Sequence, residues 1–113
     1  MMEIEKEKVK NAWVLSPQGK IEHENAPVFQ RLVTEIIEQE KDSSILIDLS
    51  DIEFISSAGL RVFLIIAKTL QKDKRAFGLC KMNQLVEEIF EVSGFNQIIK
   101  VYPSRDEAEF LNA

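Results

Sequence analysis

The sequence Ile45-Leu46-Ile47-Asp48-Leu49 is a short apolar run rich in β-branched residues. Such a run is typical of a central strand that is covered on both faces. Shortly after it comes Phe54-Ile55-Ser56-Ser57-Ala58-Gly59-Leu60, where a predicted helix begins at adjacent small residues. Ligands and partners of open α/β sheets usually bind at the carboxyl ends of the strands. The two stretches therefore predict an α/β fold and the edge of the sheet at which it acts.

The chain ahead of this run predicts a β-hairpin. A weak first strand covers residues 3–10, a turn follows at Asn11, and a second strand covers residues 12–16. Pro17 cannot donate to a strand ladder, so it marks the end of the second strand. Gly19 is then expected to begin a loop.

Helices and strands alternate through the rest of the chain. Asn25 is a plausible N-cap for a helix whose apolar pairs recur every four residues. The later predicted elements are a helix at 57–72, a strand at 76–80, a helix at 84–92 that stops near Gly94, a strand at 98–102, and a terminal helix with Phe110 and Leu111 that opens with a capping box of Ser104 and Glu107. This order predicts a single α/β domain over residues 1–113, with a mixed β-sheet, an N-terminal hairpin and about four helices packed against it.

The composition fits one small domain. At 113 residues, 45% hydrophobic and 29% charged, the chain can bury a core. Fourteen Lys and Arg against 19 Asp and Glu give a net charge of −5, so bulk electrostatics would not attract a phosphate backbone. We therefore expect no nucleic acid partner.

Cysteine use and hydropathy suggest where the protein acts. Cys80 is the only cysteine and cannot form an intramolecular disulfide, which fits a reducing cytosol. The longest unbroken apolar run, Val62 to Ala67, is far shorter than the roughly 20 residues needed to span a bilayer. Residues 1–8 alternate in charge where a secretory signal would be apolar. We expect a cytoplasmic protein without membrane insertion.

The paired serines before the predicted helix have two interpretations. In the first, Ser56 or Ser57 only caps the helix, a role worth about 1 kcal/mol, and Gly59 permits close packing. In the second, one serine is a phosphoacceptor, and its phosphate adds roughly −1.5 to −2 charges beside the helix N-terminus. The local pattern alone leaves both interpretations open.

Several segments together resemble the STAS domain of anti-sigma factor antagonists. They are the strand at 45–49, the segment 54–60, Val92-Ser93-Gly94-Phe95, and Gly19-Lys20-Ile21-Glu22. The resemblance covers essentially the whole chain and implies partner switching in bacteria. The unphosphorylated antagonist binds an anti-sigma factor that is also a serine kinase, and this binding frees the sigma factor. Phosphorylation by that kinase ends the binding, and a serine phosphatase resets the protein.

The resemblance also implies roles for single residues. The family motif places an aspartate before the phosphorylated hydroxyl residue, so Ser57 is the implied phosphoacceptor and Ser56, in the place of the aspartate, is the alternate. Glu22 stands where the family commonly has Asp. Arg61 lies one turn after Ser57, where it could pair with a phosphate or serve as a solvated surface arginine.

The helix at 57–72 has apolar residues on nearly all sides. Val62 and Ile65 fall opposite the main apolar stripe, so either a neighbouring helix covers them or they belong to an exposed docking patch. The predicted partner-binding residues are Glu22, Ser56, Ser57, Ala58, Gly59, Arg61, Val62 and Ile65.

The sequence predicts no catalytic residue, no metal site and no cofactor. His23 is the only histidine, and with one cysteine it completes neither a metal site nor a nucleophile-base pair. Two other functions remain as alternatives to the switch. One is an unmodified STAS subunit that binds a fixed partner in a lipid transporter or a signalling scaffold. The other is a small enzyme or nucleotide-binding module at the carboxyl edge of the sheet.

Overall fold

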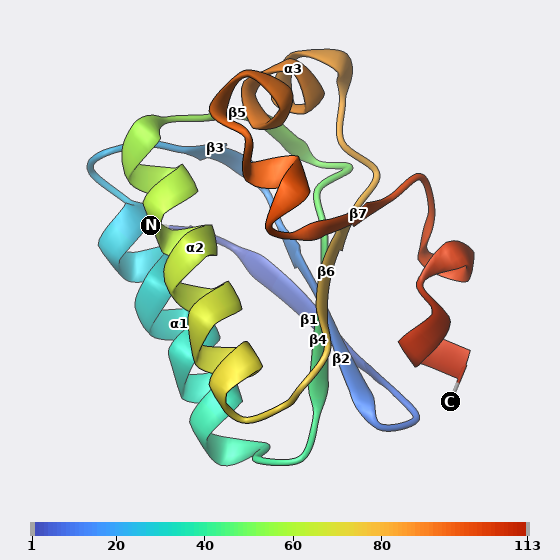
Figure 1. Ribbon diagram of the computed structural model, residues 1–113. Coiled ribbons are helices and arrows are strands. Elements are labelled where there is room, and N and C mark those ends of the chain that lie inside the picture. Colours follow the sequence, from blue (N-terminus) through green and yellow to red (C-terminus); the bar gives the residue numbers. More distant parts are fainter. Residues whose placement is uncertain (1, 113) are drawn as a thin grey trace.

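A five-stranded mixed sheet runs through the middle of the computed structural model, which describes residues 2–112 (Figure 1). Its strands, in spatial order, are β1 (Ile4–Val9), β2 (Ala12–Pro17), β4 (Ser44–Asp48), β6 (Phe77–Cys80) and β7 (Lys100–Tyr102). The β1–β2 pair is antiparallel and the other pairs are parallel. The predicted N-terminal hairpin and the central position of the strand near 45–49 are therefore confirmed.

The structure also contains a second, two-stranded parallel sheet. It pairs β3 (Gly19–Ile21) with β5 (Ile52–Ile55), and its last register pair joins Ile21 to Ile55. The expectation that Gly19 begins a loop is wrong, because the chain turns through a positive φ of 97° at Gly19 and enters β3 directly. This small sheet determines the position of the next helix.

Two long helices cover one face of the main sheet (Figure 1). They are α1 (Ala26–Gln39) and α2 (Ser57–Lys72), and they pack against each other. Between them and the sheet, Phe63 is fully buried, with its ring centroid 5.3 Å from that of Phe29 and 5.8 Å from that of Phe90. These three rings join α1, α2 and α3 (Gln84–Ser93) into one core.

Helix α3 is tied to the small sheet by its N-cap. The Asn83 side chain accepts a hydrogen bond from the Val86 N–H and donates to the carbonyl oxygen of Ile52 at 3.1 Å. The helix ends at Gly94, which has a left-handed φ of 79°. A short 3₁₀ turn, η1 (Phe95–Gln97), follows and shortens the strand predicted at 98–102 to β7.

The C-terminal segment covers the other face of the sheet and does not form the predicted fourth α-helix. It makes two 3₁₀ turns, η2 (Arg105–Glu107) and η3 (Glu109–Asn112), separated by Ala108 in an extended conformation. Ser104 precedes η2 but makes no side-chain cap, so the predicted capping box is wrong. Ala108 and Leu111 instead pack into a small core on this face, an arrangement that a continuous helix could not follow.

No helix within the described residues 2–112 has the length and apolar character needed to cross a membrane.

Candidate functional site at the start of helix α2

Ser56 caps helix α2 and is held by the small sheet. Its N–H donates to the carbonyl oxygen of Ile21 at 2.8 Å, and its Oγ accepts a hydrogen bond from the N–H of Gly59 at 3.3 Å. Its carbonyl oxygen accepts the N–H of Leu60 at 2.9 Å. The hydroxyl that was predicted to cap the helix is thus the one on Ser56.

Ser57 occupies the first helical position and has a different environment. The residue is exposed, and its hydroxyl has no hydrogen-bond partner within residues 2–112. In the same range, the N–H groups of Ser57 and Ala58 are the first-turn donors that remain without a partner. The free hydroxyl and the free helix donors therefore lie together at the start of the helix.

Gly59 allows helix α2 to approach the small sheet closely. A Cβ at this position would lie 2.8 Å from the Cγ2 atoms of both Ile21 and Ile55. Both isoleucines are fully buried and belong to paired strands. The absence of a side chain at residue 59 therefore sets the distance between the helix start and β3 and β5.

We expect Gly59→Ala to lower the free energy of unfolding by about 1–2 kcal/mol, because overpacking outweighs the helix propensity of alanine. Urea unfolding followed by circular dichroism measures the effect. The sign of the change in the free energy of unfolding decides the question, since the higher helix propensity of alanine would by itself stabilise the variant. A more stable variant would show that α2 can shift away from β3 without cost.

Glu22 lies beside the serines because of the strand register. The Ile21–Ile55 pair places Glu22 level with Ser56 at the carboxyl ends of β3 and β5, and its side chain is half-buried. Its N–H donates to Oδ1 of Asn25 at 2.7 Å. Asn25 stands at the N-cap position of α1 as predicted, but its side chain closes this loop and makes no helix cap.

The other predicted partner-binding residues divide by exposure. Arg61 is exposed one turn after Ser57 and makes no ion pair with another described residue. Val62 is only 4% exposed in the core that α1 and α2 share, so its inclusion in a docking patch is a wrong prediction. Ile65 is 37% exposed. Val62 is therefore covered by its neighbours, and a role for the more exposed Ile65 in partner binding stays a prediction.

Two exposed apolar residues near this edge were not predicted as part of a surface. Leu85 and Val92 lie on α3, which packs on β5 as α2 does, and they are 49% and 91% exposed. Periodicity could have identified them, since both fall off the buried stripe that carries Val86 and Phe90. They leave exposed apolar area on helix α3.

An ion pair between the buried Asp48 and the partly exposed Arg105 lies at the carboxyl end of β4. The Asp48 carboxylate is 2.7 Å from Nε of Arg105 and accepts the N–H of Ser50 at 2.9 Å. Burial alone would raise the pKa of Asp48, but the Ser50 N–H and the Arg105 guanidinium outweigh it and hold the pKa below its usual value. The pair anchors η2 to the sheet.

Cys80 has the environment of an unreactive thiol. Burial, together with the nearby Asp48 carboxylate, raises the pKa of Cys80 to about 11. Across residues 2–112, His, Cys, Asp and Glu side chains form no group of three that could hold a metal ion.

Known proteins resemble this chain in sequence and in fold. Residues 3–108 match the family model of the STAS domain. BtrV of Bordetella bronchiseptica, an anti-sigma factor antagonist by name, is 34% identical over 109 residues, which make up 95% of this chain and 91% of BtrV. The crystal structure of TM1081 from Thermotoga maritima, likewise an anti-sigma factor antagonist by name, gives a TM-score of 0.88 at 26% identity and covers 97% of this chain and 95% of that one. The chain therefore belongs to the STAS domain family and, within it, to the anti-sigma factor antagonists.

SpoIIAA shares the fold at lower identity. Its unphosphorylated form gives a TM-score of 0.80 at 16% identity, and its phosphorylated form gives 0.72 at 17% identity. The two comparisons cover 97% and 98% of this chain. Anti-sigma factor antagonists are non-enzymatic regulators, so the prediction that the chain is not an enzyme is confirmed by its family.

Proposed function

We propose that this protein is a cytoplasmic, single-domain phosphoswitch whose phosphoacceptor is Ser57. In its unphosphorylated form it binds an anti-sigma factor that is also a serine kinase, and the sigma factor is released. Phosphorylation of Ser57 ends this binding, and a serine phosphatase reverses the modification. The observation that carries the proposal is that the two serines have different environments. The Ser56 hydroxyl caps the helix, while Ser57 is exposed and its hydroxyl has no hydrogen-bond partner within residues 2–112.

The chemistry at Ser57 fits phosphoryl transfer from a kinase. The Ser57 oxygen would attack the γ-phosphorus of ATP, its proton would pass to a base of the kinase, and ADP would leave. The product carries roughly −1.5 to −2 charges at the helix N-terminus. The unpartnered N–H groups of Ser57 and Ala58 and the exposed Arg61 one turn later would stabilise this charge.

The same geometry explains how serine can stand where the family commonly has aspartate. Aspartate and serine are both strong N-cap residues, so Ser56 keeps the helix cap while it removes a negative charge beside the acceptor. We infer that kinase recognition of this chain depends on Glu22 for a nearby carboxylate, since Glu22 lies level with Ser56.

The proposal has support from its relatives. BtrV is an anti-sigma factor antagonist by name, and SpoIIAA, which shares the fold, has been solved both with and without phosphate. A direct test is incubation with ATP and an anti-sigma factor kinase from the same organism, followed by peptide mass spectrometry. Wild type and Ser56→Ala should each gain one phosphate on Ser57, and Ser57→Ala should gain none. Phosphate on Ser56 alone would reject the site.

We expect Ser57→Asp to weaken binding to the anti-sigma factor at least tenfold, because it places a fixed charge at an interface, while Ser57→Ala should bind as the wild type does. Isothermal titration calorimetry measures both. Thr69→Asp is the matched control, since it places the same charge on an exposed residue about 18 Å further along α2. Equal weakening by Thr69→Asp would show that net charge, and not the position of Ser57, governs binding.

A further inference from the structure

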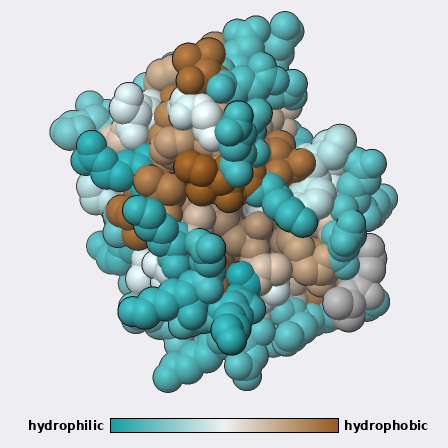
Figure 2. Space-filling view, viewed as in Figure 1, coloured by the Kyte–Doolittle hydropathy of each residue, from teal (hydrophilic) through white to brown (hydrophobic). Residues whose placement is uncertain are grey.

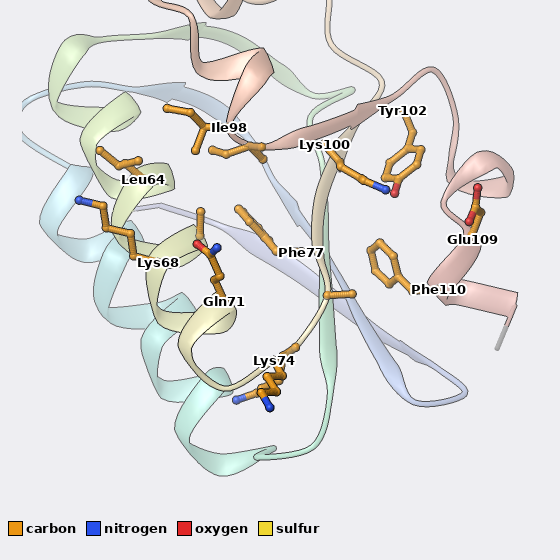
Figure 3. A pocket seen from close by; sticks show the side chains of 14 residues that line it. Leu64, Lys68, Gln71, Lys74, Phe77, Ile98, Lys100, Tyr102, Glu109 and Phe110 are labelled. Atoms are coloured by element: carbon orange, nitrogen blue, oxygen red, sulfur yellow. The ribbon is translucent and has the colours of Figure 1, made fainter.

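An apolar groove at the edge of the main sheet has no part in the proposed switch. It has a volume of about 710 Å³ and lies between the second half of α2, strands β6 and β7, and η3 (Figure 3). Small-molecule pockets are typically about 300–1,000 Å³, so the groove has the size of a ligand site. Ser57 and its neighbours do not line it.

The floor of the groove is apolar. Leu64 and Ala67 come from α2, Phe77 from β6 and Phe110 from η3. Ile98 forms part of the rim and is 61% exposed. Figure 2 shows apolar surface over this part of the molecule, between α2 and β7. A bound apolar chain would remove this surface from water.

The rim of the groove is positively charged although the protein carries a net charge of −5. Lys68, Lys74 and Lys100 line it and are exposed, and none of the three pairs with an acidic residue within the described part of the chain. Glu109 is the one acidic residue in the lining. This local reversal of charge favours an anionic ligand.

The fourth cation in the lining has a structural role. Arg75 donates from Nε to the carbonyl oxygen of Ser43 at 2.7 Å and from its two terminal nitrogens to the carbonyls of Ile37 and Glu40. Its side chain is 5% exposed. The charge available to a ligand therefore comes from the lysines, which can move to meet it.

We propose that this groove binds an anionic amphiphile, namely a long-chain carboxylate. Its alkyl chain would lie on the apolar floor and its carboxylate among the lysines. The groove curves around the edge of the sheet, with Phe77 on one side of the strands and Tyr102 and Phe110 on the other (Figure 3). A flexible chain can follow this curve, whereas a partner helix about 10–12 Å wide is straight and could only cover the opening.

Titration of the full chain with dodecanoate, followed by amide shifts in ¹H–¹⁵N NMR spectra, tests the proposal. We expect shifts confined to the second half of α2, β6, β7 and η3. Dodecyltrimethylammonium has the same tail and the opposite charge, and it should bind at least tenfold more weakly. Equal binding of the two amphiphiles, shifts elsewhere, or no shifts below the micellar concentration would overturn the proposal.

Two variants localise the binding. Ala67→Trp fills the floor and should reduce affinity at least tenfold, and Lys68→Glu, a surface change that leaves the core intact, should reduce it about fivefold. Lys72→Glu is the matched control, because Lys72 is exposed on the same helix but does not line the groove. An equal loss in Lys72→Glu would overturn the proposal. So would self-association of the protein through this face, measured by sedimentation, since a second copy would then be the occupant.

Discussion

Phe63→Ala should reduce the free energy of unfolding by about 3–5 kcal/mol, the range observed when a buried phenylalanine is truncated. Phe63 is fully buried, and its ring lies between those of Phe29 and Phe90. The substitution would leave a cavity where α1, α2 and α3 meet. Since small domains have only about 5–15 kcal/mol of stability, the variant should be close to unfolding at 37 °C. Urea denaturation followed by circular dichroism gives the difference.

Ile65→Ala provides the comparison for Phe63→Ala. Ile65 is on the same helix but is 37% exposed, so its truncation should cost less than about 1 kcal/mol. If both variants lost similar stability, the three-ring cluster would not be the centre of the core.

Asp48→Asn should reduce the free energy of unfolding by about 2–3 kcal/mol at pH 7. The substitution removes the charge that pairs with Arg105, whose side chain is 35% exposed and can be partly hydrated after the change. The loss is therefore smaller than for a fully buried pair. Equilibrium unfolding of wild type and variant over a pH series measures it.

The effect of Asp48 has a defined dependence on pH. Its pKa in the folded protein lies below the ordinary value of 3.8, so the carboxylate stabilises the fold above that value. The stabilisation disappears as the pH falls through the lowered pKa, because the wild-type carboxyl group then becomes neutral as well. The two unfolding curves should converge in acid. A constant difference across the series would mean that shape, and not charge, explains the loss.

Glu7→Gln is the control for this pair. Glu7 also contacts Arg105, at 3.4 Å, but its side chain is 64% exposed. Its removal should change stability by less than about 1 kcal/mol, as for other surface ion pairs.

The long elements of this fold could be predicted from the sequence because their side chains carry the pattern. The boundaries of α2 at Ser57 and Lys72 follow from a capping serine and a long apolar repeat, and both are confirmed. The central strand is marked by its continuous apolar run. By contrast, β3 and β5 have only three and four residues, and each is stabilised by a partner about 30 positions away. No local periodicity could reveal that pairing.

The two wrong predictions, a capping box near the C-terminus and an exposed Val62 on α2, have the same cause. Ser104 and Glu107 have the spacing of a capping box, but Arg105 is held by Asp48, 57 residues earlier in the sequence, and the segment follows the sheet. Val62 lies on an apolar face of α2, and only the packing of α1 decides that this face is covered. Sequence reasoning found which side chains could interact, whereas the long-range contacts determined which of them do.

The sequence indicated Ser56 and Ser57 as candidate residues but not how their hydroxyl groups are arranged. Ser56 and Ser57 were equivalent as candidate caps, and the hydrogen bond from the Gly59 N–H to the Ser56 Oγ distinguishes them. The groove beside β7 had no sequence signature, because its lining comes from four separate elements.

The close fit of Gly59 against β3, together with the bond between Ser56 and Ile21, fixes the start of α2 to the sheet. If Ser57 is the phosphoacceptor, as proposed, we expect a helix start held in this way to keep its arrangement on phosphorylation, so that the domain itself adds no threshold to the response. Occupancy of the proposed partner should then follow, in simple proportion, the fraction of molecules that are not phosphorylated. Any steepness in the output would have to arise from the opposing rates of the enzymes that add and remove the phosphate.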